Sequence, residues 1–271
     1  MPTPGSSNAV RAQDEGHGEG HDYVKGSPHL RHAALRSMVE DRLTGAVRAT
    51  VERQGSCHVL EIGAGHGTFT DCLLAAGAKV TVTEASQASA DLLRAKYAGD
   101  DRVEVFYDET GEEMLDGGRT FDAASCIAVL HHIPDYAVFV DRLSGLIAPE
   151  GWFFSVQDPL WYPRQPKRVH RTMRAAYLFW RLGQGNYGRG LRTRLRRLRG
   201  VYSETDPSDL IEYHVVRDGV DEEALRAVLS PRFGEVEVFT YWSTQSPLFY
   251  KLGARTSMCS EFGILAVQRQ P

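Results

Sequence analysis

The sequence contains no hydrophobic run long enough to cross a membrane, and its first residues lack the basic-then-apolar pattern of a secretory signal. None of its four cysteines forms a Cys-x-x-Cys pair, and no histidine cluster accompanies them. This spacing speaks against a zinc site and against a disulfide framework. We therefore expect a soluble cytoplasmic protein with reduced thiols and no bound metal.

An excess of positive charge is also missing. The 31 Lys and Arg residues are outnumbered by 35 Asp and Glu residues, so the net charge is -4. A general nucleic-acid binder needs a basic face to neutralise phosphates, which makes that function class a poor match. With 271 residues and 42% hydrophobic composition, the chain can build one large domain with an insertion. We expect a small-molecule partner rather than nucleic acid or membrane, and a homodimer is possible.

Glycine is concentrated at one informative place, where residues 59–69 read VLEIGAGHGTF. An apolar run ends in Gly63, Gly65 and Gly67, and a helical pattern follows. Glycine accepts positive φ and lets a ligand approach the backbone, and the amides of the next helix start face that ligand. About 20 residues later, a second alternating run ends on Glu84, where a carboxylate can accept both hydroxyls of a ribose. This pattern predicts a nucleoside site on an α/β sheet.

The spacing of these glycines distinguishes between nucleosides. A dinucleotide fingerprint reads G-x-G-x-x-G, but here Thr68 holds its last position and the glycine comes one place early. The pattern G-x-G-x-G after an acid, Glu61, resembles the first motif of the class I S-adenosylmethionine-dependent methyltransferases. The plainer interpretation, that three glycines only make a turn, is weakened by the position of Glu84.

Two later motifs strengthen the resemblance. Residues 121–135 read FDAASCIAVLHHIPD, which resembles the fourth-strand motif of the same family, with Asp122 at the strand's start. Residues 148–151 read as a turn before an aromatic fifth strand at 152–156. The three motifs follow one another in the family's order between residues 59 and 158.

The resemblance implies an α/β fold: a seven-stranded Rossmann-like sheet of order 3-2-1-4-5-7-6 with the last strand antiparallel. Helical spacing from Pro28 to about Val51 predicts one or two helices ahead of this sheet. We expect the following organisation: a mobile tail at 1–22, an N-terminal helical cap at 23–55, and a methyltransferase domain at 56–271, with an insertion at 159–218 as a substrate lid, strands at 234–242 and 261–269, and a long loop at 243–260.

The resemblance also implies cofactor contacts. Glu61 would organise the glycine turn and the methionine end, which Tyr23 of the cap would also contact. Adenine would be bound by an acid just past the third strand, either Glu109, which we favour, or Asp108, although a solvated loop pair is the competing interpretation. The full set of residues expected at the cofactor is Tyr23, Glu61, Gly63, Ala64, Gly65, Gly67, Glu84, Ala85, Asp108, Glu109, Thr110, Ile127 and Ala128.

Methyl transfer is an in-line displacement that mainly requires positioning, but a hydroxyl acceptor must also lose its proton to a base. Histidine suits that role near neutral pH. His131 follows the fourth strand at the family's substrate-facing position, while His132 is expected to pack inward. His214 returns from the insertion, and Asp158 ends the fifth strand near the substrate. A structural role is the alternative for each of these residues.

We therefore expect methylation of a hydroxyl, or secondarily an amine, on a small natural-product-like acceptor, as in antibiotic biosynthesis and other secondary metabolism. Aromatic residues in the insertion would form the pocket wall. Its arginine-rich run at 189–199 is interpreted as a solvated or partner-facing helix rather than an RNA site. One alternative is a methyltransferase fold that uses the cofactor only as a prop for cyclisation or decarboxylation. The other, an NAD(P)-dependent reductase, is disfavoured by Thr68 and Glu61.

Overall fold

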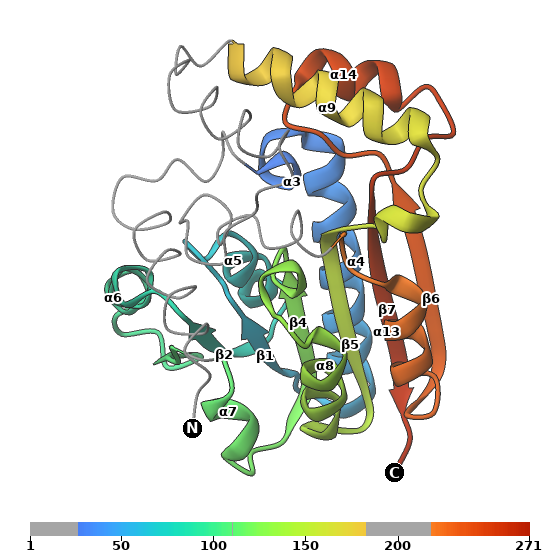
Figure 1. The fold of residues 1–271 in the computed structure, drawn as a ribbon. Coiled ribbons are helices and arrows are strands. Elements are labelled where there is room, and N and C mark those ends of the chain that lie inside the picture. Colours follow the sequence, from blue (N-terminus) through green and yellow to red (C-terminus); the bar gives the residue numbers. More distant parts are fainter. Residues whose placement is uncertain (1–26, 110, 183–217) are drawn as a thin grey trace.

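The computed structural model describes residues 27–109, 111–182 and 218–271. Seven strands form one sheet in the order β3-β2-β1-β4-β5-β7-β6, with β7 antiparallel to both of its neighbours and the other pairs parallel (Figure 1). The predicted strand order is therefore confirmed. The strands are β1 (His58–Ile62), β2 (Lys79–Glu84), β3 (Val103–Tyr107), β4 (Phe121–Ile127), β5 (Ile147–Pro159), β6 (Phe233–Tyr241) and β7 (Glu261–Arg269).

Helices cover both faces of this sheet. On one face, α4, α5 and α6 pack with the strands around a core that includes Leu43, Leu73 and Leu93. On the other face, α7, α8 and α13 pack around Leu143 and Leu225. The described α-helices are α3 (Pro28–Arg31), α4 (Ala33–Gln54), α5 (Thr68–Ala75), α6 (Gln87–Lys96), α7 (Glu113–Asp116), α8 (Tyr136–Gly145), α9 (Lys167–Leu182), α13 (Glu222–Leu229) and α14 (Pro247–Gly253).

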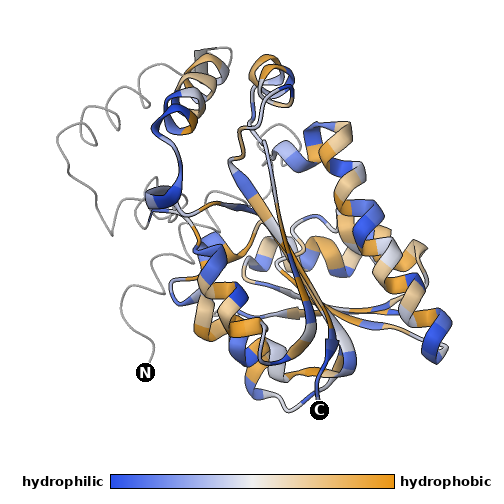
Figure 2. Cartoon of the chain, turned by 90° about the vertical axis from the view of Figure 1, so that its right-hand side faces the viewer, coloured by the Kyte–Doolittle hydropathy of each residue, from blue (hydrophilic) through white to orange (hydrophobic). Residues whose placement is uncertain are grey.

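The central strands are almost continuously apolar because both of their faces are buried. In β4, six of the seven residues are buried, and from Gly151 to Pro159 β5 is buried throughout. The hydropathy colouring shows the same arrangement, with hydrophobic strands inside and polar stripes along the outer sides of the helices (Figure 2). Because β1 pairs in parallel with both β2 and β4, the carboxyl ends of these three strands lie side by side at one edge.

Two expectations about local structure are wrong. Residues 148–151 do not form a turn, because β5 runs through them with a left-handed Glu150 (φ 64°) and a register shift against β4. The expected loop at 243–260 contains α14, which starts on Pro247 and is tied to the sheet where Trp242 Nε1 donates to Phe249 O at 3.0 Å. The strand expected at 234–242 is present as β6, with bounds one residue earlier, at 233–241.

Several predicted features lie outside the described residues: the tail 1–22, Tyr23, Thr110, His214 and the arginine-rich run. The described part of the insertion begins with a 3₁₀ turn, Tyr162–Arg164, and continues as α9. Among the helices of the described ranges, none has the length and apolarity needed to cross a bilayer.

Candidate functional site

The glycine motif forms the connection between β1 and α5. Gly63, Gly65 and Gly67 all have positive φ, at 68°, 57° and 74°. A Cβ on Gly63 would lie 2.8 Å from Val129 Cγ2, and one on Gly67 would lie 2.5 Å from the Tyr97 hydroxyl. Larger side chains would therefore strain this backbone and collide with its neighbours. The loop keeps its tight path because only glycine fits there.

Glu84 closes the loop from the end of β2. Its Oε2 accepts a hydrogen bond from Gly65 N at 2.8 Å, and its Oε1 accepts from Ala85 N at 3.1 Å and Ser86 N at 3.3 Å. The carboxylate that the sequence places about 20 residues after the glycines is thus directly bonded to them. The two parts of the expected nucleoside site, the glycine loop and the Glu84 carboxylate, therefore meet at the carboxyl ends of β1 and β2.

Glu61 lies beneath the loop on β1 and is 3% exposed. Thr70 Oγ1 donates a hydrogen bond to Glu61 Oε2 at 2.6 Å, and this bond joins the end of strand β1 to the first turn of α5. Burial raises the pKa of Glu61 from 4.5 to about 7, although the Thr70 bond opposes this shift. The side chain therefore supports the loop from inside the protein.

The two acids after β3 have different surroundings. Asp108 is 2% exposed and accepts from Met114 N at 3.2 Å through Oδ2, whereas Glu109 is exposed. The choice between them as the adenine acceptor stays a prediction. At the neighbouring strand end, Ile127 is the last residue of β4, and Ala128 is left-handed (φ 58°) with its N donating to Val156 O.

These residues fit a nucleoside cofactor. The glycine loop brings bare backbone to the edge of the sheet, and the Glu84 carboxylate stands beside it to accept ribose hydroxyls. Glu61 is sealed below, so the loop rather than its side chain presents the binding surface. The arrangement has the acidic and glycine positions that the sequence predicts for this site.

His131, which is partly buried, and the buried Asp158 form a pair at the next strand ends. His131 belongs to a 3₁₀ turn after β4, Leu130–His132, and its Nδ1 lies 2.8 Å from Asp158 Oδ1. The same oxygen accepts from His131 N at 3.0 Å, and Asp158 Oδ2 accepts from Ser155 Oγ at 3.0 Å. Asp158 is fully buried. Two residues that the sequence analysis placed separately near the substrate are therefore partners.

The bulge in β5 sets the direction of Asp158. Gln157 is left-handed (φ 68°), and the ladder to β7 passes from Val156–Gly263 directly to Asp158–Phe262. Gln157 is therefore the extra residue, and Tyr241 Oη accepts from its backbone N at 2.8 Å. A bulge re-aims the side chains that follow it. The sequence contains no glycine or proline at this position to indicate the bulge.

Three further titratable side chains surround the pair. His132 packs its ring 4.0 Å from that of His131, centroid to centroid. His29, on α3, is 6% exposed and stacks on Phe69, and burial together with the charge of His131 lowers its pKa to about 3. Glu261 is buried, and burial with the nearby Asp158 raises its pKa well above the usual range. Sequence reasoning missed Glu261 and gave His29 no role, since neither stands in a motif.

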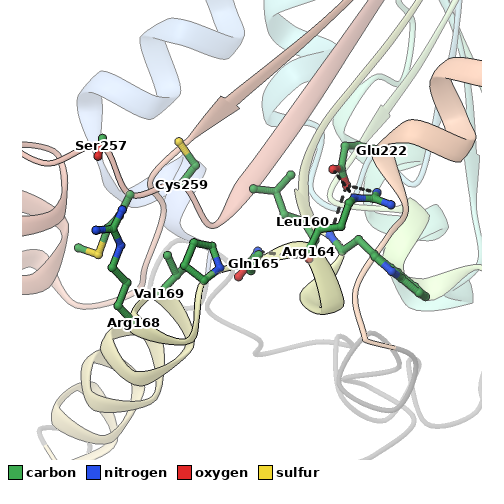
Figure 3. A pocket seen from close by; sticks show the side chains of 11 residues that line it. Leu160, Arg164, Gln165, Arg168, Val169, Glu222, Ser257 and Cys259 are labelled. Atoms are coloured by element: carbon green, nitrogen blue, oxygen red, sulfur yellow. Dashed lines mark hydrogen bonds and ion pairs between the residues drawn. The ribbon is translucent and has the colours of Figure 1, made fainter.

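A separate cavity of about 190 Å³ lies at the start of the insertion (Figure 3). Leu160, Val169 and Cys259 contribute apolar walls, and Arg164 is held at one side by Glu222. Its lining includes neither His131 nor any glycine of the loop. It is therefore distinct from the site at the strand ends. Among the described residues, no group of three or more His, Cys, Asp or Glu side chains could hold a metal ion.

Comparison with known proteins agrees with this geometry. A protein-family model described as a methyltransferase domain matches residues 60–153. A ubiquinone biosynthesis O-methyltransferase from Alkalilimnicola ehrlichii is 32% identical over 133 residues, which cover 48% of this chain and 51% of the relative. The counterpart from Leptothrix cholodnii is 30% identical over 112 residues, covering 40% of this chain and 47% of that protein. The chain thus spans about half the length of the curated relatives it matches.

Solved structures extend the likeness of fold over the whole chain. The plantazolicin methyltransferase BamL, solved with a triazolic desmethylPZN analogue and S-adenosylhomocysteine, has a TM-score of 0.55 at 13% identity, and the match covers 98% of this chain and 97% of that chain. The N-methyltransferase NodS from Bradyrhizobium japonicum, also solved with S-adenosylhomocysteine, has a TM-score of 0.51 at 14% identity, covering 97% and 99%. At these identities the match establishes the fold.

Proposed function

We propose that this chain is a class I S-adenosylmethionine-dependent methyltransferase, and that it methylates a hydroxyl, or secondarily an amine, of a small natural-product-like acceptor; its domain match and its fold support this proposal. The observation that carries the proposal is the His131–Asp158 pair, 2.8 Å apart at the carboxyl ends of β4 and β5. Ligands of open α/β sheets bind outside these strand ends.

The cofactor, when bound, supplies a methyl group already activated by the sulfonium. Gly63, Gly65 and Gly67 would receive it against bare backbone, with Glu84 at the ribose and Glu61 supporting the loop from below. Since Glu84 already accepts from Gly65 N, one carboxylate would hold the loop and the ribose together. The protein's remaining task is to place the acceptor atom and to remove its proton.

The Asp158 carboxylate gives His131 the features of a general base. Because Asp158 is an acceptor, it favours the tautomer with the proton on Nδ1, which puts the ring lone pair on Nε2. The second bond, from His131 N to the same oxygen, fixes the orientation of the ring. His131 would take the acceptor's proton, and Asp158 would stabilise the imidazolium that forms.

The acceptor class is supported from two sides. The curated relatives are named for ubiquinone biosynthesis, and the structural neighbour BamL is named for plantazolicin. Both names support a small-molecule acceptor. In this chain, Tyr177 and Trp180 of α9 pack with ring centroids 5.9 Å apart in the segment expected to form the lid. We infer an acceptor with an aromatic or otherwise flat apolar body.

A labelled-methyl assay tests the reaction. The chain is incubated with S-adenosylmethionine carrying a labelled methyl group and with fractionated small-molecule extracts, and products are identified by mass spectrometry. Transfer of label to a small molecule is expected. A product that is altered but unlabelled would contradict methyl transfer and support use of the cofactor as a prop.

The base is tested with His131→Gln and Asp158→Asn. Each should lower kcat by about 10²- to 10⁴-fold, the usual contribution of general base catalysis, with little change in the affinity for S-adenosylhomocysteine. His58→Gln is a matched control, because His58 is a half-buried histidine at the start of β1, whereas the site lies beyond the carboxyl ends of the strands. Equal kcat values for the His131 variant and the control would refute the assignment.

The cofactor contact is tested with Glu84→Ala. Loss of a charged acceptor should weaken S-adenosylhomocysteine binding by about 1–3 kcal/mol, measured by calorimetry. Glu104→Ala is the control. Glu104 lies on β3, the strand next to β2, and forms an ion pair with Arg119 away from the glycine loop. An effect of Glu84→Ala on acceptor affinity alone would count against this site.

A further inference from the structure

Two helices at the carboxyl end of the sheet carry an unusual combination of exposed side chains. α9 and α14 lie side by side at the top of the molecule, and the rings of Phe179 and Phe249 pack between them at 5.4 Å (Figure 1). Phe179 is 60% exposed, Leu248 61% and Leu252 53%. We call the outward surface of α9, α14 and the turn after α14 the α9–α14 face.

The same face is basic. Its exposed charged residues are Lys167, Arg168, Arg171, Arg174, Lys251 and Arg255. Neither helix contains an Asp or Glu, and the sequence has no acidic residue between Asp158 and Glu204 or between positions 242 and 261. Within the described ranges, no ion pair involves any of these six cations. A chain with a net charge of -4 therefore concentrates six cations here that have no ion-pair partner among the described residues.

The two kinds of side chain lie close together. At 3.6 residues per turn, Arg168, Arg171 and Phe179 fall within an arc of roughly 80° around α9. The buried residues Val169 and Ala176 lie on the adjoining side of α9, about 60–80° from Phe179 around the helix axis. On α14, Leu248 and Leu252 are four residues apart and thus share one side of the helix, next to Lys251. Exposed apolar groups among cations are the pattern of a helix that lies in a membrane interface.

We propose that the α9–α14 face docks on the surface of a membrane that contains anionic lipids. The lipid phosphates would neutralise the six cations, and the acyl boundary would receive Phe179, Leu248 and Leu252. A second copy of the chain is a poor occupant, because two such faces would oppose cation to cation. RNA would satisfy the charges, but it offers no apolar phase for the two leucines.

Vesicle co-sedimentation with the full chain tests this proposal without cofactor or acceptor, so its outcome is independent of the proposed function. Vesicles of phosphatidylcholine alone are compared with vesicles that contain about one quarter phosphatidylglycerol. We expect binding only to the anionic vesicles, weakened when salt is raised from about 0.05 M to about 0.5 M. Absence of binding to anionic vesicles at low salt would overturn the proposal.

Surface variants locate the contact. Arg171→Glu with Arg174→Glu should lower vesicle partitioning at least tenfold, and Leu248→Ser with Leu252→Ser severalfold while the salt dependence remains. Matched controls lie elsewhere on the surface: Arg48→Glu with Arg226→Glu for charge, and Val138→Ser for an apolar residue that is 53% exposed. Controls and variants that bind vesicles equally, or face variants that lose binding only to a single-stranded RNA oligonucleotide, would refute membrane docking. Near-wild-type circular dichroism confirms that each variant folds.

Discussion

A single buried carboxyl connects the glycine loop to the stability of the protein. Glu61 is sealed under the loop and receives one hydrogen bond, from Thr70, so burial dominates and raises its pKa to about 7. The folded state therefore holds this proton more tightly than the unfolded chain does. The resulting stabilisation is complete below pH of about 4.5 and is lost as the pH rises through about 7.

Glu61→Gln keeps an acceptor for Thr70 but cannot ionise. Between pH 5 and pH 8, the free energy of unfolding of the wild type should therefore fall by up to about 3 kcal/mol relative to the variant. Denaturant unfolding at several pH values measures this difference, and other titrating groups cancel because both proteins contain them. Parallel pH profiles for the two proteins would contradict the role assigned to Glu61.

Individual residues differed in how well the sequence could predict them. Gly63, Gly65, Gly67 and Glu84 follow a fixed spacing along neighbouring strands, so their meeting was predictable. The bond between His131 and Asp158 depends on a bulge that the sequence does not mark. His29 comes from a helix about 100 residues away from its neighbour His131, and only the packing of that helix brings them together.

At the scale of elements, α14 depends on one close approach. A Cβ on Gly253 would lie 2.1 Å from Trp242 Nε1, the atom that ties α14 to β6 through Phe249 O. Gly253→Ala should therefore destabilise the protein by about 1–3 kcal/mol. Gly45→Ala is the control: nothing lies within 4 Å of its added Cβ in α4, and alanine should stabilise that helix by about 0.5–1 kcal/mol. Thermal unfolding should show a lower Tm for Gly253→Ala and a higher Tm for Gly45→Ala. Equal changes in Tm for the two variants would contradict this packing.

Some helices and strands could be predicted from the periodicity of apolar residues alone, and others could not. Strands β1 to β4 and helices α5, α6 and α8 were predictable because apolar runs and glycine turns alternate regularly, whereas the four-residue α7 was not predicted. Residues 148–151 imitate a turn, since Pro149 and Gly151 are turn residues in most contexts. Here Gly151 is required for a different reason: a Cβ would lie 2.4 Å from Asp122 O on the neighbouring strand. α14 was missed because its seven residues are too few to show a period.

At the scale of the whole molecule, both core clusters share one sheet, so we expect a single cooperative unfolding transition. A ligand that binds only the folded state adds about 2.7 kcal/mol at a concentration 100 times its Kd. S-adenosylhomocysteine should therefore raise Tm by several degrees, as scanning calorimetry would show. A shift with NAD(P)H but not with S-adenosylhomocysteine would instead favour the reductase alternative.

The topology of the whole sheet was the easiest feature to predict, because the three motifs resemble a family whose strand order is 3-2-1-4-5-7-6. The acceptor side was the hardest. The described residues around the His131–Asp158 pair come from α3, the turn after β4, β5 and β7, which are distant in sequence and carry no shared motif. Such a surface forms only through tertiary packing, which periodicity cannot report.

The extra residue in β5 determines which changes to the chain keep the orientation of Asp158. Deleting one position between Trp152 and Gln157 would restore an unbroken ladder and turn Asp158 towards the opposite layer of helices. A replacement confined to residues 160–217 would instead leave β5 and its partner strand β7 unchanged, so the extra residue would remain. A chimera that joins a foreign lid after Pro159 would inherit the acid in its present orientation, so new acceptor ranges could be grafted there.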